Sequence, residues 1–331
     1  MLEHGGALRA AAARYGIPLG DWLDLSTGIN PQGWPVPPLP AAVWQRLPES
    51  DDGLETAAAA YYGSPHLLPV AGSQAAIQAL PLLREPSWVG VLNPSYAEHA
   101  HAWRRVGHRV NVWPVEAVDV AVAQSDVLVL VHPNNPTGVR FPLALLLDWR
   151  AQLAARGGWL VVDEAFMDAT PAESLAHHVG LPGLIVLRSL GKFFGLAGAR
   201  VGFVLAEPVL LERLQEQLGP WTVSGPSRWV AMQALTDHGW QEKTQMGLSR
   251  AGGRLADLLQ RQRLPVAGGT GLFRWVPLPD VEFWQDALAR RGILVRRFSG
   301  PPGLRFGLPG PEPAWRRLEL ALAGVRAERL R

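Results

Sequence analysis

The feature that most constrains the fold is a regular alternation of short apolar runs and helical patterns, which begins near residue 54. The apolar runs cover residues 88–92, 110–113, 127–131, 159–162, 184–187 and 201–205. They are nearly continuous rather than alternating, as expected for strands that are covered on both faces. Helical patterns at 74–83, 97–106, 143–156 and 208–217 separate many of them. This order predicts an α/β domain with a mostly parallel sheet.

The two ends of the chain have a different pattern. Residues 1–40 contain a helical pattern at 7–15 and a Pro/Gly-rich stretch at 30–38, which predicts an irregular N-terminal arm. One long helix over 226–262 is predicted to lead into strands at 272–276, 293–298 and 304–307, with helices at 280–291 and 313–328. We therefore predict an arm (1–40) that packs with a small α+β domain (226–331), and a large α/β domain (41–225).

The composition narrows the class of function. The chain has 331 residues, 48% of them hydrophobic, and a formal net charge of +2, which gives no general case for nucleic acid or membrane binding. It has no cysteine, which excludes disulfides, a cysteine nucleophile and thiolate metal sites, and we predict no metal site. We find neither a secretory signal nor an apolar run of the roughly 20 residues that a spanning helix needs. A cytoplasmic protein is expected.

Lys192 is one of only two lysines, and it lies in a Gly- and Phe-rich segment between two apolar runs. Loss of water lowers the pKa of an amine, and a neutral amine can attack a carbonyl carbon. Ser189 and Arg200 flank it and could bind a phosphate beside the amine. By itself, the segment is also compatible with an exposed loop lysine.

Asp163 ends the apolar run 159–162 and precedes Lys192 by 29 residues (192 − 163), room for one helix and one strand. The carboxyl ends of parallel strands face the ligand crevice. A carboxylate there could hold a protonated ring nitrogen, although an Asp that caps the next helix is a common alternative.

Three further segments follow predicted strands. Asn135 lies in the turn His132-Pro133-Asn134-Asn135-Pro136, where it could donate to a ligand oxygen or simply form the turn. Gly72, Ser73 and Gln74 open a helix, whose free N–H groups favour a phosphate. Tyr96 follows the run 88–92 and could stack on a ring or serve only in packing.

In this order the motifs resemble those of the fold type I (aspartate-aminotransferase-like) enzymes that use pyridoxal 5′-phosphate (PLP), over nearly the whole chain. The combination of Asn135-Pro136-Thr137-Gly138 with Ser189, Lys192 and Arg200 is specific to that group. The resemblance implies that Lys192 holds PLP covalently, Asp163 pairs with the pyridine nitrogen, Asn135 contacts O3′ and Tyr96 stacks on the ring. It assigns the phosphate to Gly72, Ser73, Gln74, Ser189 and Arg200.

Within that group the chain resembles the histidinol-phosphate aminotransferases, and most of all the L-threonine-O-3-phosphate decarboxylases of cobalamin synthesis. His4-Gly5-Gly6, residues 25–31 and residues 219–224 carry this resemblance. So does Phe166, where the aminotransferases usually have a Tyr that reaches the cofactor. The chain departs from the pattern at Leu47, where relatives have a Tyr that reaches the PLP phosphate of the neighbouring subunit. It also lacks a further Arg shortly after Arg305.

The resemblance implies PLP-dependent decarboxylation of threonine phosphate by a homodimer, with Lys192 returning a proton to Cα. Arg305 is the candidate for the substrate carboxylate, and Arg296, His4 and Asn30 are candidates for the substrate phosphate or its surroundings. Arg296 could instead lie on a solvated strand edge, and His4 could merely order the arm. The alternatives are an aminotransferase of the histidinol-phosphate type and a non-catalytic PLP-binding or scaffold protein.

Overall fold

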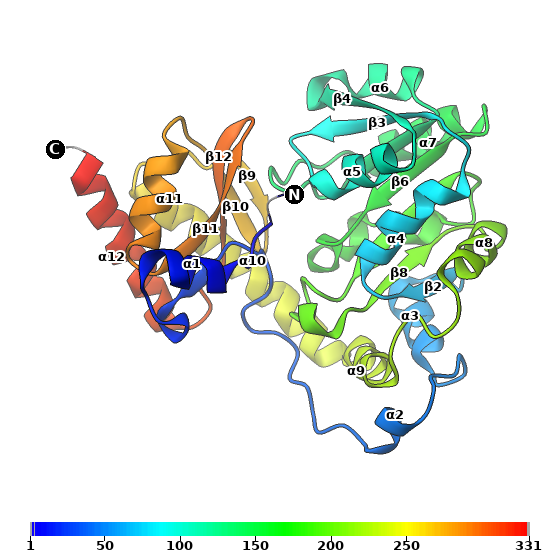
Figure 1. Cartoon of the computed structure of the whole chain (residues 1–331), viewed down its shortest axis with the longest axis horizontal. Helices are drawn as coiled ribbons and strands as arrows, with labels where there is room; N and C mark the ends of the chain where they lie inside the picture. Colours follow the sequence, from blue (N-terminus) through cyan, green and yellow to red (C-terminus); the bar gives the residue numbers. More distant parts are fainter. Residues whose placement is uncertain (1, 3, 330–331) are drawn as a thin grey trace. The chain divides into compact units, whose positions relative to one another are not determined.

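The computed structural model describes residue 2 and residues 4–329, which divide into two compact units (Figure 1). The large unit comprises Gly33–Asn135 and Arg140–Lys243. The small unit comprises the chain up to Gln32, the segment Pro136–Val139 and the chain from Thr244 onward.

The large unit is built on a seven-stranded sheet in the order β2-β8-β7-β6-β5-β3-β4. Its strands are β2 (Leu67–Val70), β3 (Trp88–Asn93), β4 (Arg109–Pro114), β5 (Val127–Val131), β6 (Trp159–Asp163), β7 (Leu184–Ser189) and β8 (Gly202–Leu205). Only β8 runs antiparallel to its neighbours, β2 and β7. Every residue of β5 and β6 is buried, because continuous apolar strands need cover on both faces. The predicted mostly parallel α/β sheet is confirmed.

Two groups of helices contact this sheet. Helix α4 contacts both α5 and α8, and α6 and α7 form a second pair. The helices of this unit are α2 (Ala42–Gln45), α3 (Leu54–Tyr62), α4 (Ser73–Ala79), α5 (Ala97–Arg105), α6 (Val118–Gln124), α7 (Leu143–Ala154), α8 (Pro208–Leu218) and α9 (Gly225–Thr236). The ends of α8 carry the residues that favour the start and stop of a helix, because Pro208 occupies its first turn and Gly219 follows its last residue.

The small unit contains a five-stranded sheet in the order β1-β11-β12-β10-β9. Its strands are β1 (Leu23–Leu25), β9 (Gly268–Thr270), β10 (Phe273–Pro277), β11 (Ile293–Ser299) and β12 (Pro302–Gly307). Its helices are α1 (Leu8–Tyr15), α11 (Val281–Ala289) and α12 (Glu312–Arg329). The predicted α+β composition is confirmed, whereas the short strands β1 and β9 were not predicted.

The helix predicted over 226–262 is in fact two helices, so that prediction was wrong. Asp237 leaves helical geometry at φ −86° and ψ 74° and separates α9 from α10 (His238–Arg261). Helix α9 packs on α3 of the large unit, and the division between units falls at 243/244. Compact units need not coincide with domains, so the boundaries 40/41 and 225/226 stay a prediction.

Candidate active site

The topology of the large sheet brings the predicted cofactor residues to one edge. Strands β3, β5, β6 and β7 are parallel neighbours, so their carboxyl ends meet at that edge, with Asp163 ending β6 and Ser189 ending β7. Strand β8 runs the opposite way and therefore starts there, directly after Arg200 and Val201. Strand β2 ends there too and leads into Gly72. Residues far apart in sequence thus share one edge of the sheet, where ligands bind in folds of this kind.

Gly72 and Gly202 form a cradle of closely packed backbone and donor groups. Gly72 has φ +73°, and a Cβ atom built there would lie 2.6 Å from Nη2 of Arg200. A Cβ at Gly202 would lie 2.6 Å from the backbone nitrogen of Ser73, and Gly202 pairs with Ser189 across the β7–β8 ladder. A backbone N–H, a hydroxyl and an exposed guanidinium in one place form a donor set for phosphate.

Asp163 is buried, at 3% exposed, and both of its carboxylate oxygens have partners. Oδ1 accepts the backbone N–H of Ala165 at 3.0 Å, and Oδ2 lies 2.9 Å from Nε2 of His99. His99 was not among the predicted site residues. The available signal was its position in the first turn of α5, three residues after Tyr96, which is the N-cap residue of that helix.

Tyr96 connects this carboxylate to the phosphate cradle. Its hydroxyl donates to Oε1 of Gln74 at 3.3 Å, and its ring meets His99 edge-on at 6.0 Å between centroids. Burial raises the pKa of Tyr96 to about 12, and the charges of Asp163 and Glu98 act in the same direction. The phenol therefore keeps its proton, and can donate it to Gln74, well above pH 7.

Gln74 makes a second side-chain hydrogen bond, in which its Nε2 donates to Oε2 of Glu98 at 2.9 Å. The amide is thereby fixed with its oxygen toward Tyr96. The first residues of α4 are thus tied to α5 by side-chain hydrogen bonds.

Lys192 is half-buried, so the interpretation as a fully exposed loop lysine does not fit the structure. Its Nζ lies 5.5 Å from the centroid of the buried Phe166 ring. An aromatic surface beside an amine removes water from it, which is the environment expected for attack on a carbonyl.

Asn135 lies, half-buried, in the turn after β5, and neighbouring side chains tie this turn down. Nδ2 of Asn134 donates to the carbonyl oxygen of Pro94 at 2.8 Å. The backbone N–H of His132 donates to the carbonyl oxygen of Asp163 at 2.8 Å. The turn is therefore joined both to the loop that carries Tyr96 and to the end of β6.

The candidate substrate residues lie in the small unit, where Arg296 and Arg305 stand opposite each other on β11 and β12. Directly opposed side chains share one face of a sheet. Arg305 is buried and donates to the carbonyl oxygen of Ser26. Burial, together with the positive charge of Arg296, lowers the pKa of Arg305 to about 10. Two cations held this close favour an anion between them.

The small unit also has a cavity of about 400 Å³ beside Arg296, and Arg305 is not among the residues that line it. It is lined by His4, Ser26, Arg296 and Arg297, among others. Asn30 is not among the lining residues, and its Oδ1 accepts the backbone N–H of Gln32 at 3.0 Å. The structure thus brings His4 and Arg296 together and places Asn30 in a local turn.

Comparison with known proteins identifies the family. Residues 23–330 match the family described as aminotransferase class I and II. The chain belongs to that family. A threonine-phosphate decarboxylase from Pseudomonas aeruginosa is 58% identical to this family member over 98% of both chains. One from Sinorhizobium sp. is 41% identical, over 97% of this chain and 98% of the relative.

Among solved structures, histidinol-phosphate aminotransferase from Sinorhizobium meliloti, in complex with pyridoxal-5′-phosphate, superposes with a TM-score of 0.82. It is 20% identical and covers 99% of this chain and 96% of that one, so it shows the fold alone. The residues of the large unit fit PLP, since the glycine cradle suits a phosphate and the edge of the sheet also carries an acid, an aromatic ring and a lysine. Among the described residues, no group of three or more His, Asp or Glu side chains could hold a metal ion.

Proposed function

We propose that this chain decarboxylates L-threonine O-3-phosphate to (R)-1-aminopropan-2-yl phosphate and CO2, a PLP-dependent reaction of cobalamin synthesis. The observation that carries the proposal is the 58% identity, over 98% of both chains, to a protein named threonine-phosphate decarboxylase. The second relative of that name, at 41%, supports it. A relative named histidinol-phosphate aminotransferase, from Mycobacterium bovis, is less similar, at 31% identity over 95% of this chain, and the aminotransferase structure at 20% identity supports the fold alone.

PLP, when bound, supplies an electron sink for the pair released from Cα. Asp163, held by Ala165 N–H and His99, is positioned to keep a proton on the pyridine nitrogen. Asn135 is assigned to O3′ and Tyr96 to the ring face. The phosphate is assigned to the cradle, with ligands from Gly72, Ser73, Gln74, Ser189 and Arg200.

Lys192 has two roles in this proposal. Its Nζ anchors the cofactor, and after CO2 leaves, the same amine is the proton donor to Cα. Phe166 lies next to the amine and has no hydroxyl that could donate a proton to Cα in place of Lys192. A phenol at this position would offer a second proton donor.

The substrate carries a carboxylate and a phosphate, and the small unit offers cations for both. Arg305, with its planar fork of donors, is assigned to the carboxylate. Arg296 and His4, at the cavity of about 400 Å³, are assigned to the phosphate. Asn30 is assigned to the surroundings of that site, where its hydrogen bond to Gln32 shapes the arm.

Two incubations decide between the reactions. Release of CO2 from threonine phosphate without 2-oxoglutarate supports decarboxylation. Formation of glutamate that depends on 2-oxoglutarate, with histidinol phosphate as amine donor, would instead establish the aminotransferase. Borohydride treatment should fix the cofactor on Lys192, and activity in Lys192→Ala equal to wild type would overturn the covalent role.

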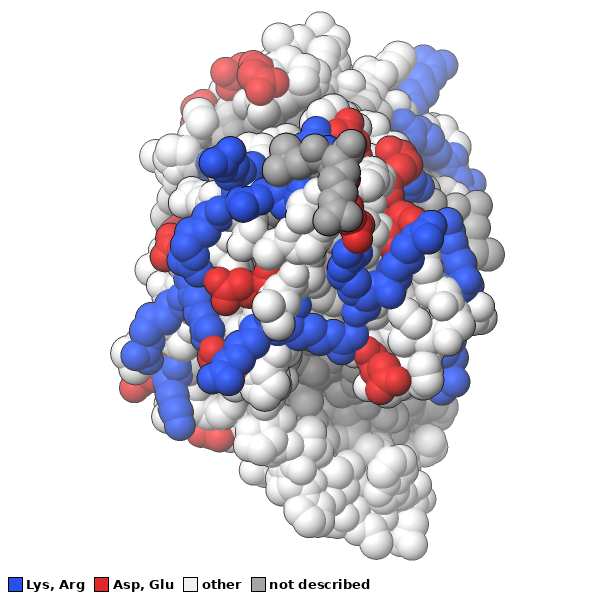
Figure 2. Space-filling model, turned by 90° about the vertical axis from the view of Figure 1, so that its left-hand side faces the viewer, with Lys and Arg blue, Asp and Glu red and all other residues white. Residues whose placement is uncertain are grey.

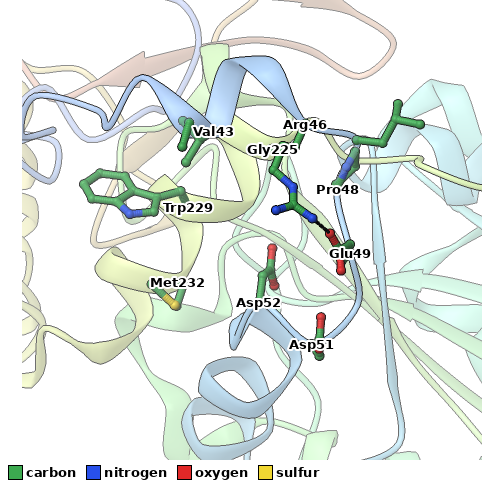
Figure 3. A pocket seen from close by; sticks show the side chains of 11 residues that line it. Val43, Arg46, Pro48, Glu49, Asp51, Asp52, Gly225, Trp229 and Met232 are labelled. Atoms are coloured by element: carbon green, nitrogen blue, oxygen red, sulfur yellow. Dashed lines mark hydrogen bonds and ion pairs between the residues drawn. The ribbon is translucent and has the colours of Figure 1, made fainter.

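The proposed assembly is a homodimer that forms through the segment around α2. Trp44 and Leu47 are 69% and 63% exposed, which is unusual for such large apolar side chains. Leu47 also lines a pocket of about 380 Å³. Val43, Trp229 and Met232 line the same pocket (Figure 3). Trp44→Arg should shift the mass in sedimentation from dimer to monomer, and an unchanged mass would refute this interface.

The charge distribution supports a small anionic ligand rather than nucleic acid. The small unit has 17 Arg and 10 Asp or Glu, a net charge of +7, whereas the large unit has a net charge of −5. Figure 2 shows acidic side chains interspersed among the arginines, and Arg254 and Glu312, for example, form a two-pronged ion pair. None of the described helices is long and apolar enough to cross a membrane. A cytoplasmic location is proposed from the cysteine-free composition, and cell fractionation would test it.

A further inference from the structure

A single guanidinium links the two strands that carry the acid and the serine of the cofactor site. Arg188 lies in β7 directly before Ser189 and is 1% exposed. Its Nη1 donates to Oε2 of Glu164 at 2.5 Å, and its Nη2 donates to Oδ1 of Asp168. Glu164 directly follows Asp163. One side chain thus reaches from the end of β7 to the segment that follows β6.

Glu164 and Asp168 are the two ends of the turn after β6, and both are fully buried. Other hydrogen bonds complete the cluster, because Oε1 of Glu164 accepts the N–H of Leu175 at 2.8 Å and Asp168 Oδ1 accepts the hydroxyl of Tyr61 at 3.2 Å. Burial raises the pKa of each carboxyl group, and the charge of Arg188 opposes this. Arg188 therefore favours the ionised form of both carboxyl groups.

The turn held in this way carries the aromatic ring beside the lysine. Phe166 is the central residue of the turn, and its ring centroid lies 5.5 Å from Nζ of Lys192. The N–H of Ala165, also in the turn, donates to Oδ1 of Asp163. A shift of either end of the turn would therefore move both the ring next to the amine and a donor to the carboxylate.

We propose that Arg188 is a positioning residue of the cofactor site, which clamps both ends of the 164–168 turn and thereby orients Phe166 toward Lys192 and Ala165 toward Asp163. The inference rests on the proposed PLP site. The planar fork of arginine directs two separate nitrogens at two carboxylates in a fixed geometry, whereas lysine offers the donors of a single nitrogen on a flexible stem. A buried ionic cluster is often no more stabilising than apolar packing of the same volume. We therefore infer that this cluster serves to hold the 164–168 turn in one position.

Arg188→Lys tests the clamp, because lysine keeps the charge but can hold only one carboxylate well. We expect PLP to bind at least about tenfold more weakly, which corresponds to about 1.4 kcal/mol. We also expect the pH midpoint of the visible absorbance of bound PLP to shift, since both the ring beside the amine and the donor to Asp163 move. A loss of stability alone would not produce that shift in folded protein.

A second variant covers the case in which lysine prevents folding. Arg188→Met combined with Glu164→Gln and Asp168→Asn removes all three charges at similar volume, so no uncompensated buried charge remains, which is the main cost of breaking such a cluster. We expect it to show the same weaker PLP binding and a shifted midpoint, because the turn is no longer clamped. If either folded variant has the wild-type dissociation constant and midpoint, the positioning role is overturned.

The matched control is Arg228→Met. Arg228 is also buried and also pairs with two carboxylates, those of Asp52 and Glu55, but it joins α9 to α3. This variant should melt at a lower temperature and keep wild-type PLP affinity and midpoint. If Arg228→Met shifted the absorbance midpoint as much as Arg188→Lys does, Arg188 would contribute only to the general stability of the fold. Wild-type protein that binds no PLP would refute the proposed function itself.

Discussion

His132 should make the stability of this protein depend on pH between 7 and 5. The side chain is 1% exposed, and its Nε2 accepts the backbone N–H of Phe141 at 3.0 Å. Acceptance at Nε2 requires the neutral ring, with the proton on Nδ1, an atom that is buried without a hydrogen-bond partner. Burial, helped by the charge of Arg140, lowers the pKa of His132 from 6.5 to about 4.

The magnitude follows from the difference between the folded and unfolded pKa. Between pH 6.5 and about 4, His132 is protonated in the unfolded chain but not in the folded chain. The contribution of His132 to the free energy of unfolding is therefore fully present above pH 6.5 and is lost as the pH falls toward 4. At about 1.36 kcal/mol per pH unit, the total loss is about 3 kcal/mol. About 2 kcal/mol of it falls between pH 7 and pH 5.

The assay compares urea unfolding of wild type and His132→Gln at pH 7, 6 and 5. Glutamine can still accept the N–H of Phe141 but does not titrate. The free energy of unfolding should drop by about 2 kcal/mol more in wild type than in the variant between pH 7 and 5. His101→Gln, at an exposed position on α5, should behave as wild type. Parallel pH profiles for wild type and His132→Gln would refute the buried neutral histidine.

Three further predictions concern Gly72, Arg305 and the net charge of the small unit. Gly72→Ala should weaken PLP binding at least about tenfold. The backbone of Gly72, at φ +73° and ψ 157°, costs a residue with a Cβ about 1–3 kcal/mol, and that Cβ would meet Arg200. The control is Gly157→Ala, which has φ +69° and open space around it and should lower only stability. Arg305→Gln should reduce kcat/KM by about 10- to 100-fold, because it loses a charged hydrogen bond to the substrate. The melting temperature should not fall, since the burial that lowers the pKa of Arg305 also makes this cation costly to the folded state. A wild-type kcat/KM in the variant would show that Arg305 does not belong to the substrate site. Raising the ionic strength from about 0.01 to about 0.15 M shortens the Debye length from about 30 to about 8 Å and should lower kcat/KM with kcat unchanged, whereas a flat profile would argue against steering by the positively charged small unit.

Much of the cofactor site follows from local sequence. Apolar runs define where buried strands end, and parallel neighbours must end at one edge, so Asp163 and Ser189 could be placed together from the sequence. Glycines such as Gly72 mark positions where only a residue without Cβ can adopt the backbone geometry. Both signals are short-range, which explains why they can be read without knowledge of the tertiary fold.

Side-chain partners across long sequence distances could not be obtained in this way. His99 and Asp163 are 64 residues apart, and the clamp of Arg188 on Glu164 depends on β6 and β7 being adjacent. The strand β9 is Gly-rich and has too little apolar pattern to predict, and the break at Asp237 lies within a pattern that is helical on both sides.

The sequence by itself therefore determined the class of sheet and the anchor positions along its edge, because strand ends and glycine geometry are local properties. The tertiary structure alone decided what surrounds those anchors: His99 against Asp163, and Phe166 beside Lys192, on a turn held by Arg188. Burial makes the difference physically. A charge or amine acquires its chemistry from the groups that replace water around it, and those groups come from distant segments.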